Sequence, residues 1–250
     1  SIQYSMNCTI AKNVIKNNKN GYGLEIYSSN NTHAVKNIMN GNHDGIQLLQ
    51  SNDCEIYNNE IDESSDGIYI YSSDNNKFSY NTITSSLYGL LLLSSNSCVL
   101  TANAVKGSRN YGIWIIDSNE NVFFHNNFVN NRAQVSTVNS ANMWNMSVEG
   151  NYWSDYLGVD QNFDGIGDQD YVIAENNIDN HPLMGAFFNF KTSLGLFIYA
   201  ICNSTISNFS YEPSNPMIQF TVNGTDGTVG FCRIRIPHAL MNETCHVTID

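Results

Sequence analysis

Residues 67–76 read Gly-Ile-Tyr-Ile-Tyr-Ser-Ser-Asp-Asn-Asn, and similar segments recur along the first half of the chain. Each segment begins at a glycine that follows Tyr or Asp and precedes an apolar residue. Successive glycines are separated by 22, 22, 22 and 23 residues. A fixed period of this length indicates a repeat protein, in which each repeat packs mainly on its neighbours. These glycines are Gly23, Gly45, Gly67, Gly89 and Gly112.

Apolar residues occupy fixed positions in every repeat. One column follows the glycine directly and a second lies two residues later, an alternation that predicts a short β-strand. Two further columns lie later in the repeat, so each repeat holds about three short strands. The columns are Leu24, Ile46, Ile68, Leu90 and Ile113; Ile26, Leu48, Ile70, Leu92 and Ile115; Ile10, Ala34, Ile56, Phe78, Leu100 and Phe123; and Ile15, Met39, Ile61, Ile83, Val105 and Phe128.

Two polar columns are stricter than the apolar ones. A repeat of 22 residues without a helical stretch has the length of one coil of a parallel β-helix. Identical Asn side chains stacked at the strand spacing of ~4.8 Å can hydrogen-bond along a ladder, so we expect a structural role for both columns. The columns are Ser5, Ser29, Ser51, Ser73, Ser95 and Ser118, and Asn13, Asn37, Asn59, Asn81, Asn103 and Asn126.

Composition excludes several classes of protein. The 250 residues include 39 Asn, a poor helix former that favours turns. The net charge of −12 argues against nucleic acid as a partner, because no basic face is available to neutralise phosphates. No apolar run of 18 residues and no charged N-terminal region occur, so we expect neither a membrane span nor a signal peptide in this chain.

Three of the six cysteines fall in one column of the repeat, two coils apart. At that spacing, ~9.6 Å, they are beyond the ~7 Å reach of a disulfide, and too far apart for a soft-metal site. We therefore predict three buried free thiols. Outside the repeat, Cys232 could pair with either of its neighbours, and the sequence leaves this open. The repeat cysteines are Cys8, Cys54 and Cys98, and the neighbours are Cys202 and Cys245.

Past residue 130 the repeat gives way to aromatic residues that we expect to cover the last coil: Trp144, Tyr152, Trp153 and Tyr156. Residues 150–156 (Gly-Asn-Tyr-Trp-Ser-Asp-Tyr), the acidic segment 160–168 and residues 178–184 (Ile-Asp-Asn-His-Pro-Leu-Met) resemble the end of NosD-type β-helix proteins. The upstream repeats are also similar to that family, so the resemblance covers roughly residues 1–185.

This resemblance implies a right-handed parallel β-helix related to pectate-lyase and carbohydrate-binding solenoids. The namesake periplasmic proteins assist copper-site maturation, whereas the same repeats are widespread in archaeal surface proteins. The family therefore implies a fold more sharply than a function. The six histidines and seven methionines are scattered, with no two histidines at ligand spacing on one strand, so we expect no copper site.

From about residue 193 a second pattern begins, with alternating strands separated by Pro, Asn-Gly and Asp-Gly turns. It predicts an antiparallel β-sandwich module and resembles the small modules that follow β-helices in archaeal cell-surface proteins. The expected organisation is all-β: a parallel β-helix of six to seven coils with a cap and an acidic loop over residues 1–190, and an incomplete sandwich over residues 191–250. The expected strands of the sandwich are 204–210, 217–222, 230–236 and 246–249.

The acidic segment Asp-Gln-Asn-Phe-Asp-Gly-Ile-Gly-Asp, residues 160–168, predicts a calcium site. Oxygen ligands at alternate positions followed by a glycine match the first nine positions of an EF-hand loop. Tyr171 stands where that loop has its bidentate Glu, so another group would complete the shell, and an acidic hairpin without an ion is the alternative. The expected ligands are Asp160, Asn162, Asp164, Asp168 and the carbonyl of Ile166.

Seven Asn-x-Ser/Thr sequons occur, and four of them lie in the final 50 residues. Their density favours N-linked glycans on an exported protein, located at the cell surface or outside the cell. The candidate acceptors are Asn7, Asn30, Asn145, Asn203, Asn208, Asn223 and Asn242.

The residues two and four positions after each repeat glycine are expected to point outward. They include no carboxylates in adjacent coils and no Lys or Arg. Both absences argue against a polyuronate lyase, so we predict no catalytic residue. They form instead an apolar stripe, whose partner could be a neighbouring subunit, the C-terminal module folded back, or a glycan. The predicted interface residues are Tyr27, Leu49, Tyr69, Tyr71, Leu93, Trp114 and Ile116.

Together these features predict a non-enzymatic structural protein of the cell surface or extracellular space. We expect it to self-associate as an envelope, filament or lattice component. The alternative is a β-helix that binds or cleaves carbohydrate.

Overall fold

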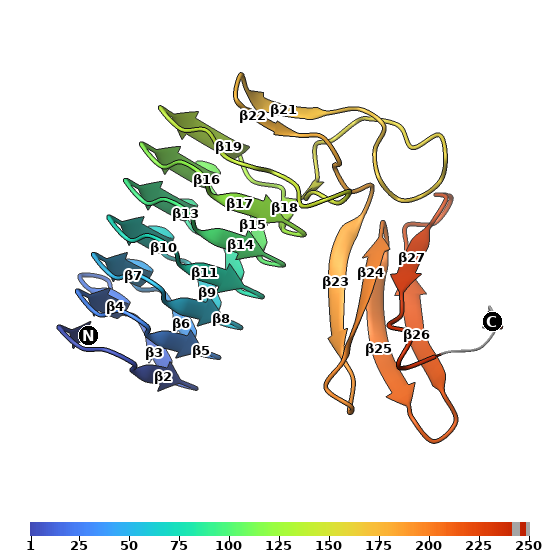
Figure 1. The fold of residues 1–250 in the computed structure, drawn as a ribbon, viewed down its shortest axis with the longest axis horizontal. Helices are drawn as coiled ribbons and strands as arrows, with labels where there is room; N and C mark the ends of the chain where they lie inside the picture. The colour runs from blue at the N-terminus through green and yellow to red at the C-terminus, as the bar shows by residue number, and fades with distance from the viewer. Residues whose placement is uncertain (242–245, 249–250) are drawn as a thin grey trace.

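The computed structural model of the chain describes residues 1–241 and 246–248. Across these residues it contains strands and turns but no α-helix. The predicted all-β class is confirmed: the first part is a parallel β-solenoid of about seven turns, and small antiparallel sheets follow it (Figure 1).

The coils of the solenoid contribute strands to three parallel sheets, one strand per sheet in each coil except the last, which has β19 and β20 but no strand in sheet B. Sheet A comprises β1 (Ile2–Gln3), β4 (Tyr22–Tyr27), β7 (Asp44–Leu49), β10 (Asp66–Tyr71), β13 (Tyr88–Leu93), β16 (Tyr111–Ile116) and β19 (Ala133–Val138). Sheet B comprises β2 (Thr9–Ala11), β5 (His33–Val35), β8 (Glu55–Tyr57), β11 (Lys77–Ser79), β14 (Val99–Thr101) and β17 (Val122–Phe124). Sheet C comprises β3 (Val14–Lys16), β6 (Ile38–Asn40), β9 (Glu60–Asp62), β12 (Thr82–Thr84), β15 (Ala104–Lys106), β18 (Asn127–Val129) and β20 (Tyr152–Trp153).

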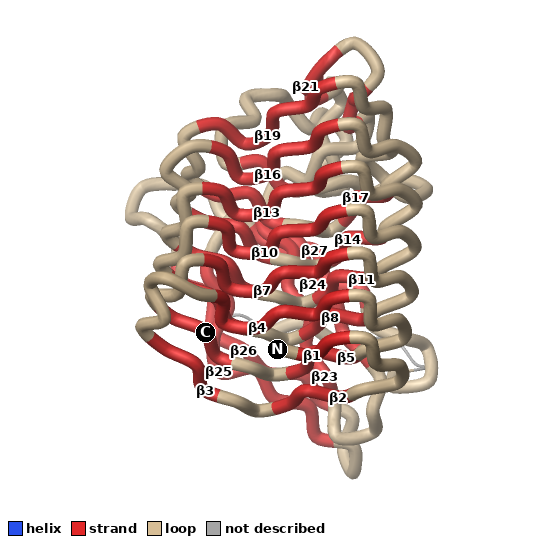
Figure 2. The backbone as a smooth tube through the Cα atoms, turned by 90° about the vertical axis from the view of Figure 1, so that its left-hand side faces the viewer, coloured by secondary structure: helices blue, strands red, loops and turns tan. Residues whose placement is uncertain are grey.

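The register of the sheets is the register of the sequence repeat. Ile68 of β10 pairs with Ile46 in the coil before and Leu90 in the coil after, and Figure 2 shows the resulting stack of sheet A strands. All four predicted apolar columns point into the core and are buried from the second coil onward, which confirms them. Burial of one branched side chain per strand contributes roughly 1.5–3 kcal/mol, which accounts for the persistence of these columns.

The repeat glycines are required because sheets A and C approach each other closely at this point. A Cβ atom added to Gly67 would lie 2.4 Å from Ile83 Cγ2 and 2.5 Å from the carbonyl oxygen of Gly89. The neighbouring repeat glycines Gly45 and Gly89 face equivalent atoms. A larger residue here would force two coils apart, which is why the glycine recurs with the period.

The Asn and Ser columns form the predicted ladders. The backbone N–H and side-chain amide of Asn81 both donate to Asn103 Oδ1, at 3.0 and 2.9 Å, and Asn59 donates to Asn81 in the same way. In the Ser ladder, the Ser51 N–H donates to Ser73 Oγ at 3.0 Å. Both columns are buried from Ser29 and Asn37 onward, so these bonds satisfy polar groups at the corners of the solenoid.

The last coil is closed by aromatic residues and a hairpin. Trp144 stacks on Phe123 at 4.2 Å between ring centroids, and Trp153 stacks on Phe128 at 4.5 Å. Tyr171 covers Trp153 in turn, at 4.4 Å. Of the four aromatic residues expected here, Trp144, Trp153 and Tyr156 cover the end of the core, whereas Tyr152 packs in a separate cluster with Leu183 and Phe187. The hairpin consists of β21 (Tyr171–Ala174) and β22 (Asn177–Asp179).

The C-terminal module has two layers. Its first sheet packs Phe190 against Phe209 of the second, at 4.1 Å, and their facing side chains form a separate small core. Residues 246–248 form no strand, so the strand expected over 246–249 is wrong for the residues that the structure describes. The first sheet comprises β23 (Ala186–Lys191), β24 (Phe197–Cys202) and β27 (Cys232–Arg235), and the second comprises β25 (Thr205–Glu212) and β26 (Met217–Asn223).

Cys54 and Cys98 are buried free thiols, as predicted. Cys8 is also a free thiol, but it is only half-buried, which corrects the prediction for this residue. Cys8 lies in the first coil of the stack, so no further coil covers its outer side. Cys245 lies outside the described residues.

Candidate functional site

The outer face of sheet A is not covered by any other part of the described chain. The C-terminal module packs instead beside the corner between sheets B and C: Tyr80, between β11 and β12, stacks on Phe197 at 6.3 Å, and Asn127 of β18 exchanges two hydrogen bonds with the backbone of Phe187 (Figure 1). One expected partner of the apolar stripe, the C-terminal module folded back, is therefore wrong.

Five of the predicted interface residues stack in register on consecutive strands of sheet A. We call this row the outer ladder. Tyr71 is the most open of the five, with 39% of its surface exposed, and the other four are half-buried by their neighbours. Val138 of β19 continues the row and is 45% exposed. The outer ladder consists of Tyr27, Leu49, Tyr71, Leu93 and Ile116.

Three aromatic rings gather beside the outer ladder. Trp114 stacks on Tyr88 at 5.1 Å between centroids and lies 5.8 Å from Tyr111. The two tyrosines are 6.0 Å apart on adjacent strands. We call Tyr88, Tyr111 and Trp114 the aromatic cluster. The predicted residue Tyr69 lies one coil below and stacks on Tyr71 at 6.5 Å.

A pair of carboxylates stands in the same column as the two tyrosines of this cluster. Asp44 and Asp66 are register partners on β7 and β10, and Asp66 is the register partner of Tyr88. The prediction of no carboxylates in adjacent coils concerned only the positions two and four after each glycine, and it holds there. Asp44 and Asp66 stand at a different position, directly before the glycine. The missed signal was the residue just before each glycine, which is Tyr or Asp in five repeats.

The two carboxylates have different surroundings. Asp44 is buried, and its oxygens contact Gln47 Nε2 at 2.6 Å and His43 Nδ1 at 2.9 Å. Asp66 is half-buried, and burial, aided by the charge of Asp44, raises its pKa to about 6, while His43 acts in the opposite direction. Only Asp66 is therefore open to a ligand, and it can present either a carboxylate or a protonated carboxyl near pH 6.

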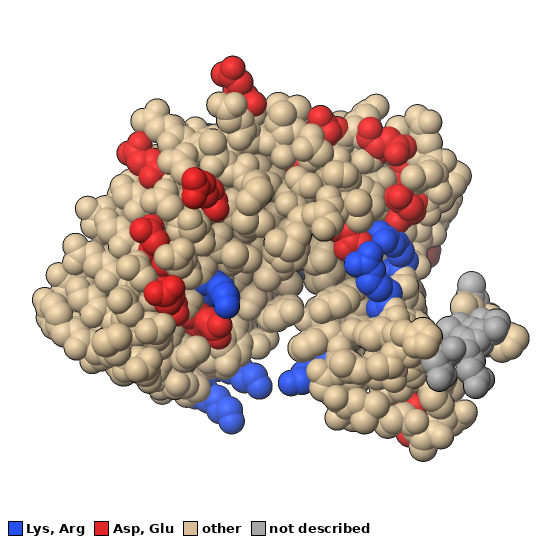
Figure 3. Space-filling view, viewed as in Figure 1, with Lys and Arg blue, Asp and Glu red and all other residues tan. Residues whose placement is uncertain are grey.

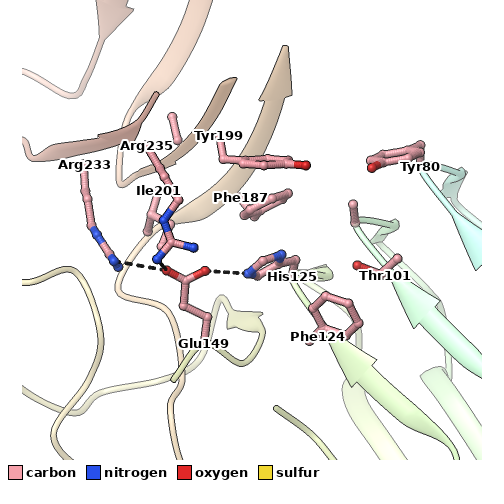
Figure 4. Close-up of a pocket in the computed structure, with 12 residues that line it drawn as sticks. Tyr80, Thr101, Phe124, His125, Glu149, Phe187, Tyr199, Ile201, Arg233 and Arg235 are labelled. Carbon is pink, nitrogen blue, oxygen red and sulfur yellow. Dashed lines mark hydrogen bonds and ion pairs between the residues drawn. The ribbon is translucent and has the colours of Figure 1, made fainter. Parts of the chain in front are cut away.

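A pocket of about 270 Å³ lies between the solenoid and the C-terminal module (Figure 4). The solenoid supplies one wall, and β23, β24 and β27 supply the other. No sequence pattern pointed to it, because its walls come from segments far apart in the chain. It is lined by Tyr80, Thr101, Ala102, Phe124, His125, Glu149, Phe187, Tyr199, Ala200, Ile201, Arg233 and Arg235.

Glu149 is the centre of the charged end of this pocket. Its side chain is 8% exposed and receives contacts from His125 Nε2 at 2.7 Å, Arg235 at 2.9 Å and Arg233 at 3.1 Å. The hydrogen bond from His125, with the charges of both arginines, lowers the pKa of Glu149 against the opposing effect of burial. Since both arginines lie on β27, the carboxylate ties the C-terminal module to the solenoid. Figure 3 shows that basic side chains are otherwise few on this face.

The structure places the predicted calcium ligands in one exposed loop. The carboxylate of Asp160 accepts the backbone N–H groups of Asp164 and Gly165, at 3.2 and 2.8 Å, and that of Asp168 accepts the N–H of Gln161 at 2.7 Å. Among the described residues, no group of three or more His, Cys, Asp or Glu side chains is arranged to hold a metal ion. Calcium binding by this loop therefore stays a prediction.

The calcium prediction can be tested with Asp164→Ala. Removing one carboxylate should weaken calcium binding strongly, because the loop already lacks the bidentate Glu. We expect the variant to lower the melting temperature more in calcium than in chelator, measured by calorimetry. A small loss in chelator is expected because Asp164 accepts the N–H of Ile166 at 2.8 Å. Equal losses in both conditions would exclude the site.

The sequons differ in exposure, and their occupancy stays a prediction. The side chains of Asn30 and Asn145 are half-buried, and Asn242 lies outside the described residues. The exposed acceptors are Asn7, Asn203, Asn208 and Asn223. Within the described part of the chain, no helix has the length and apolar character needed to cross a membrane.

Curated relatives match a short part of the chain. The probable ABC transporter binding protein NosD of Stutzerimonas stutzeri is 47% identical over 60 residues, which is 24% of this chain and 14% of that protein. The protein of the same description from Pseudomonas aeruginosa is 45% identical over 60 residues, with the same coverage. The match thus spans 14% of the length of these relatives.

Among solved structures, QnrB1, a plasmid-mediated fluoroquinolone resistance protein, aligns with 57% of this chain and 73% of its own, at 10% identity and a TM-score of 0.17. A likeness this weak supports no conclusion. The sequence model of the family described as periplasmic copper-binding protein (NosD) matches residues 1–158, the region of the coils and the cap aromatic residues. Since that match covers more than half of the chain and agrees with the repeats and the solenoid, the protein belongs to the NosD family.

Proposed function

We propose that this protein is a non-catalytic structural component of the cell envelope or extracellular space that binds neutral glycan chains along the outer face of sheet A. The family is described as periplasmic, which fits a location outside the cytoplasm. The observation that carries the proposal is the aromatic cluster beside Asp66 on an uncovered sheet.

The chemistry of this face suits a sugar. The rings of Tyr88, Tyr111 and Trp114 offer apolar surface with polar edges, and the carboxyl of Asp66 in the next coil offers hydrogen bonds to hydroxyl groups. The outward positions of the sheet A strands include no Lys or Arg, so a polymer of acidic sugars would find no counter-charge. These two features together support a neutral glycan.

The carboxylate pair supports binding rather than cleavage. Glycosidases need two carboxyl groups that both reach the scissile bond. Asp44 is buried and held by Gln47 and His43, so only Asp66 can reach a bound chain. The curated relatives are described as binding proteins, which agrees with a non-catalytic role.

The described residues do not fit a copper site, although the family description names copper. Copper prefers imidazole nitrogen and sulfur ligands that converge on one point. The ring nitrogens of His33, His43 and His125 each face a carboxylate, at 3.4, 2.9 and 2.7 Å, and no second histidine joins them. We therefore assign no step to copper in this chain.

Glycan binding can be tested with Trp114→Ala. This substitution removes the ring that contacts both tyrosines of the aromatic cluster. We expect affinity for a neutral polysaccharide to fall about tenfold, corresponding to a loss of roughly 1.4 kcal/mol of stacking. Calorimetric titration of a panel of neutral and acidic polysaccharides would measure it.

The matched control is Tyr57→Ala on sheet B, which removes a half-buried aromatic ring from another face and should leave affinity unchanged. If the unmodified protein binds none of the neutral glycans, the proposal is wrong. New reducing ends or unsaturated products in the same incubations would instead contradict the non-catalytic role.

The outer ladder favours a second candidate, self-association into a filament or lattice. A continuous apolar row on a flat sheet can pack against the same row of another copy. Replacing Tyr71 and Leu93 together with Asp should dissolve such polymers, as seen by sedimentation and electron microscopy. Unaltered polymers would exclude the ladder, and a monomer at high concentration in the unmodified protein would exclude self-association.

A further inference from the structure

Two cysteines lie side by side on adjacent strands of the C-terminal sheet. Cys202 of β24 and Cys232 of β27 are register partners in an antiparallel pair, and both are free thiols in the structure. Their side chains lie on the same side of the sheet, in the small core shared with β25 and β26. The sequence alone had left open which partner Cys232 would have.

The hydrogen-bond pattern identifies the kind of pair. The N–H of Asn203 donates to the carbonyl of Phe231 at 3.4 Å, so the next pair along, Cys202 and Cys232, is a non-hydrogen-bonded pair. In such pairs the Cα atoms are about 4.5 Å apart and the side chains approach closely. This separation lies within the range of ~4.4–6.8 Å that a disulfide spans.

We propose that Cys202 and Cys232 form a disulfide that fastens β27 to the C-terminal sheet. The two thiols together lose two protons and two electrons, and one sulfur–sulfur bond forms. The electrons pass by thiol–disulfide exchange to an oxidised thiol compound, such as glutathione disulfide or the disulfide of an oxidoreductase, which is reduced to two thiols. Oxidising compartments outside the cytoplasm supply such oxidants.

The burial of the pair indicates when this bond would form. Burial, together with the neighbouring Cys202, raises the pKa of the Cys232 thiol to about 12, and Cys202 is fully buried. Since the thiolate is the species that attacks a disulfide, exchange should be slow once the module has folded. The bond therefore belongs to the folding of the module rather than to rapid redox cycling.

The strand that the disulfide fastens also carries the contacts to the solenoid. Cys232 faces the small core, whereas Arg233 and Arg235 face Glu149 on the other side of the sheet. β27 is a short edge strand, and β25 and β26 lie in the chain segment between the two cysteines. The bond would close this segment into a loop and hold both arginines in register with Glu149.

Peptide mapping of the full chain tests the proposal. The protein is refolded in a buffer of reduced and oxidised glutathione and digested without reduction. The expected result is a linked peptide containing Cys202 and Cys232, in a protein about 2 Da lighter than its reduced form. Trypsin should cut after Arg233 and Arg235 at least about tenfold faster in the reduced protein than in the oxidised one.

Three variants sharpen the result. Cys202→Ser should abolish the linked peptide and give the fast cleavage under oxidising conditions, whereas Cys8→Ser and Cys245→Ser should leave both unchanged. Circular dichroism checks that the solenoid is intact in each variant. Linkage of Cys232 to Cys245, or free thiols at residues 202 and 232 after oxidative refolding, would overturn the proposal.

Discussion

Replacing Asn81 with Ala is expected to destabilise the solenoid by about 3–5 kcal/mol. The Asn81 side chain accepts two hydrogen bonds from Asn59 and donates to Asn103 Oδ1 and to the carbonyl of Ile56. All of these groups are buried, so alanine would leave several donors and acceptors without partners and without access to water. The loss of stability is large because Asn81 joins Asn59 in the coil before to Asn103 in the coil after, so one substitution breaks contacts in both directions.

Urea unfolding followed by circular dichroism measures this effect. The matched control is Thr82→Ala, at the next residue of the same coil, whose side chain is exposed and should cost under about 0.5 kcal/mol. Similar losses for the two variants would show that the Asn ladder contributes no more than an ordinary surface residue. A fall in the denaturant slope without a fall in stability would likewise contradict the prediction.

The solenoid could be predicted in detail because each of its coils repeats the same physical constraints. A position that is buried in one coil is buried in the next, so the columns through Ile68 and Phe78 identify the inward side chains from the sequence alone. The glycine column has the same origin, since Gly67 is close to Ile83 and Gly89 in the coils around it. The apolar alternation of one short strand predicts little by itself, but its repetition every 22 or 23 residues also predicts which residues pair between successive coils.

The corners of the coils were harder to predict. Residues with positive φ precede the Asn ladder in successive coils, and they include Lys36, Tyr80, Ala102 and His125, with φ between 54° and 59°. Of these residue types only His is enriched in that conformation, and Lys, Tyr and Ala are not. The ladder and the stacked strands impose it at those positions, where the local residue type gives no signal for it.

The candidate sites differ in the same respect. The outer ladder and Trp114 could be predicted because the repeat assigns each residue to a face. Asp44 and Asp66 could also have been found, because both stand directly before a repeat glycine. The sequence prediction rested only on the positions two and four after the glycine and therefore missed them. The C-terminal sheet and the Glu149 contacts depend on pairings between distant segments, for which no repeat supplies a register.

Replacing Glu149 with Gln is expected to weaken the attachment of the C-terminal module to the solenoid by about 1–3 kcal/mol. Loss of one partner from a fully buried ion pair costs roughly 3–5 kcal/mol. Arg233 and Arg235 have 33% and 55% of their side chains exposed, so water compensates part of that loss. Hydrogen exchange of the β27 amides would measure the attachment.

The surface pair between Glu55 and Lys77 provides the control. These side chains are 3.5 Å apart and are 40% and 66% exposed, so Glu55→Gln should cost less than about 0.5 kcal/mol. Equal exchange rates of β27 in Glu149→Gln and in the unmodified protein would show that Glu149 does not hold the module.

The attachment should also depend on pH in a direction that the Glu149 contacts determine. Because the pKa of Glu149 is lowered in the folded protein, its contribution is complete above the unfolded value of about 4.3 and is lost as pH falls through the folded value. Protection of the β27 amides, taken relative to their intrinsic exchange rate at each pH, should therefore fall below about pH 4 in the unmodified protein, while Glu149→Gln should lack this fall. Glu149 joins His125 of the solenoid to two arginines of one strand, so its protonation breaks several contacts between the two parts at once. The Asn side chains of the ladder do not titrate, and their hydrogen bonds persist in acid. Acid is thus expected to release the module before it unfolds the coils, and simultaneous loss of both would refute this order.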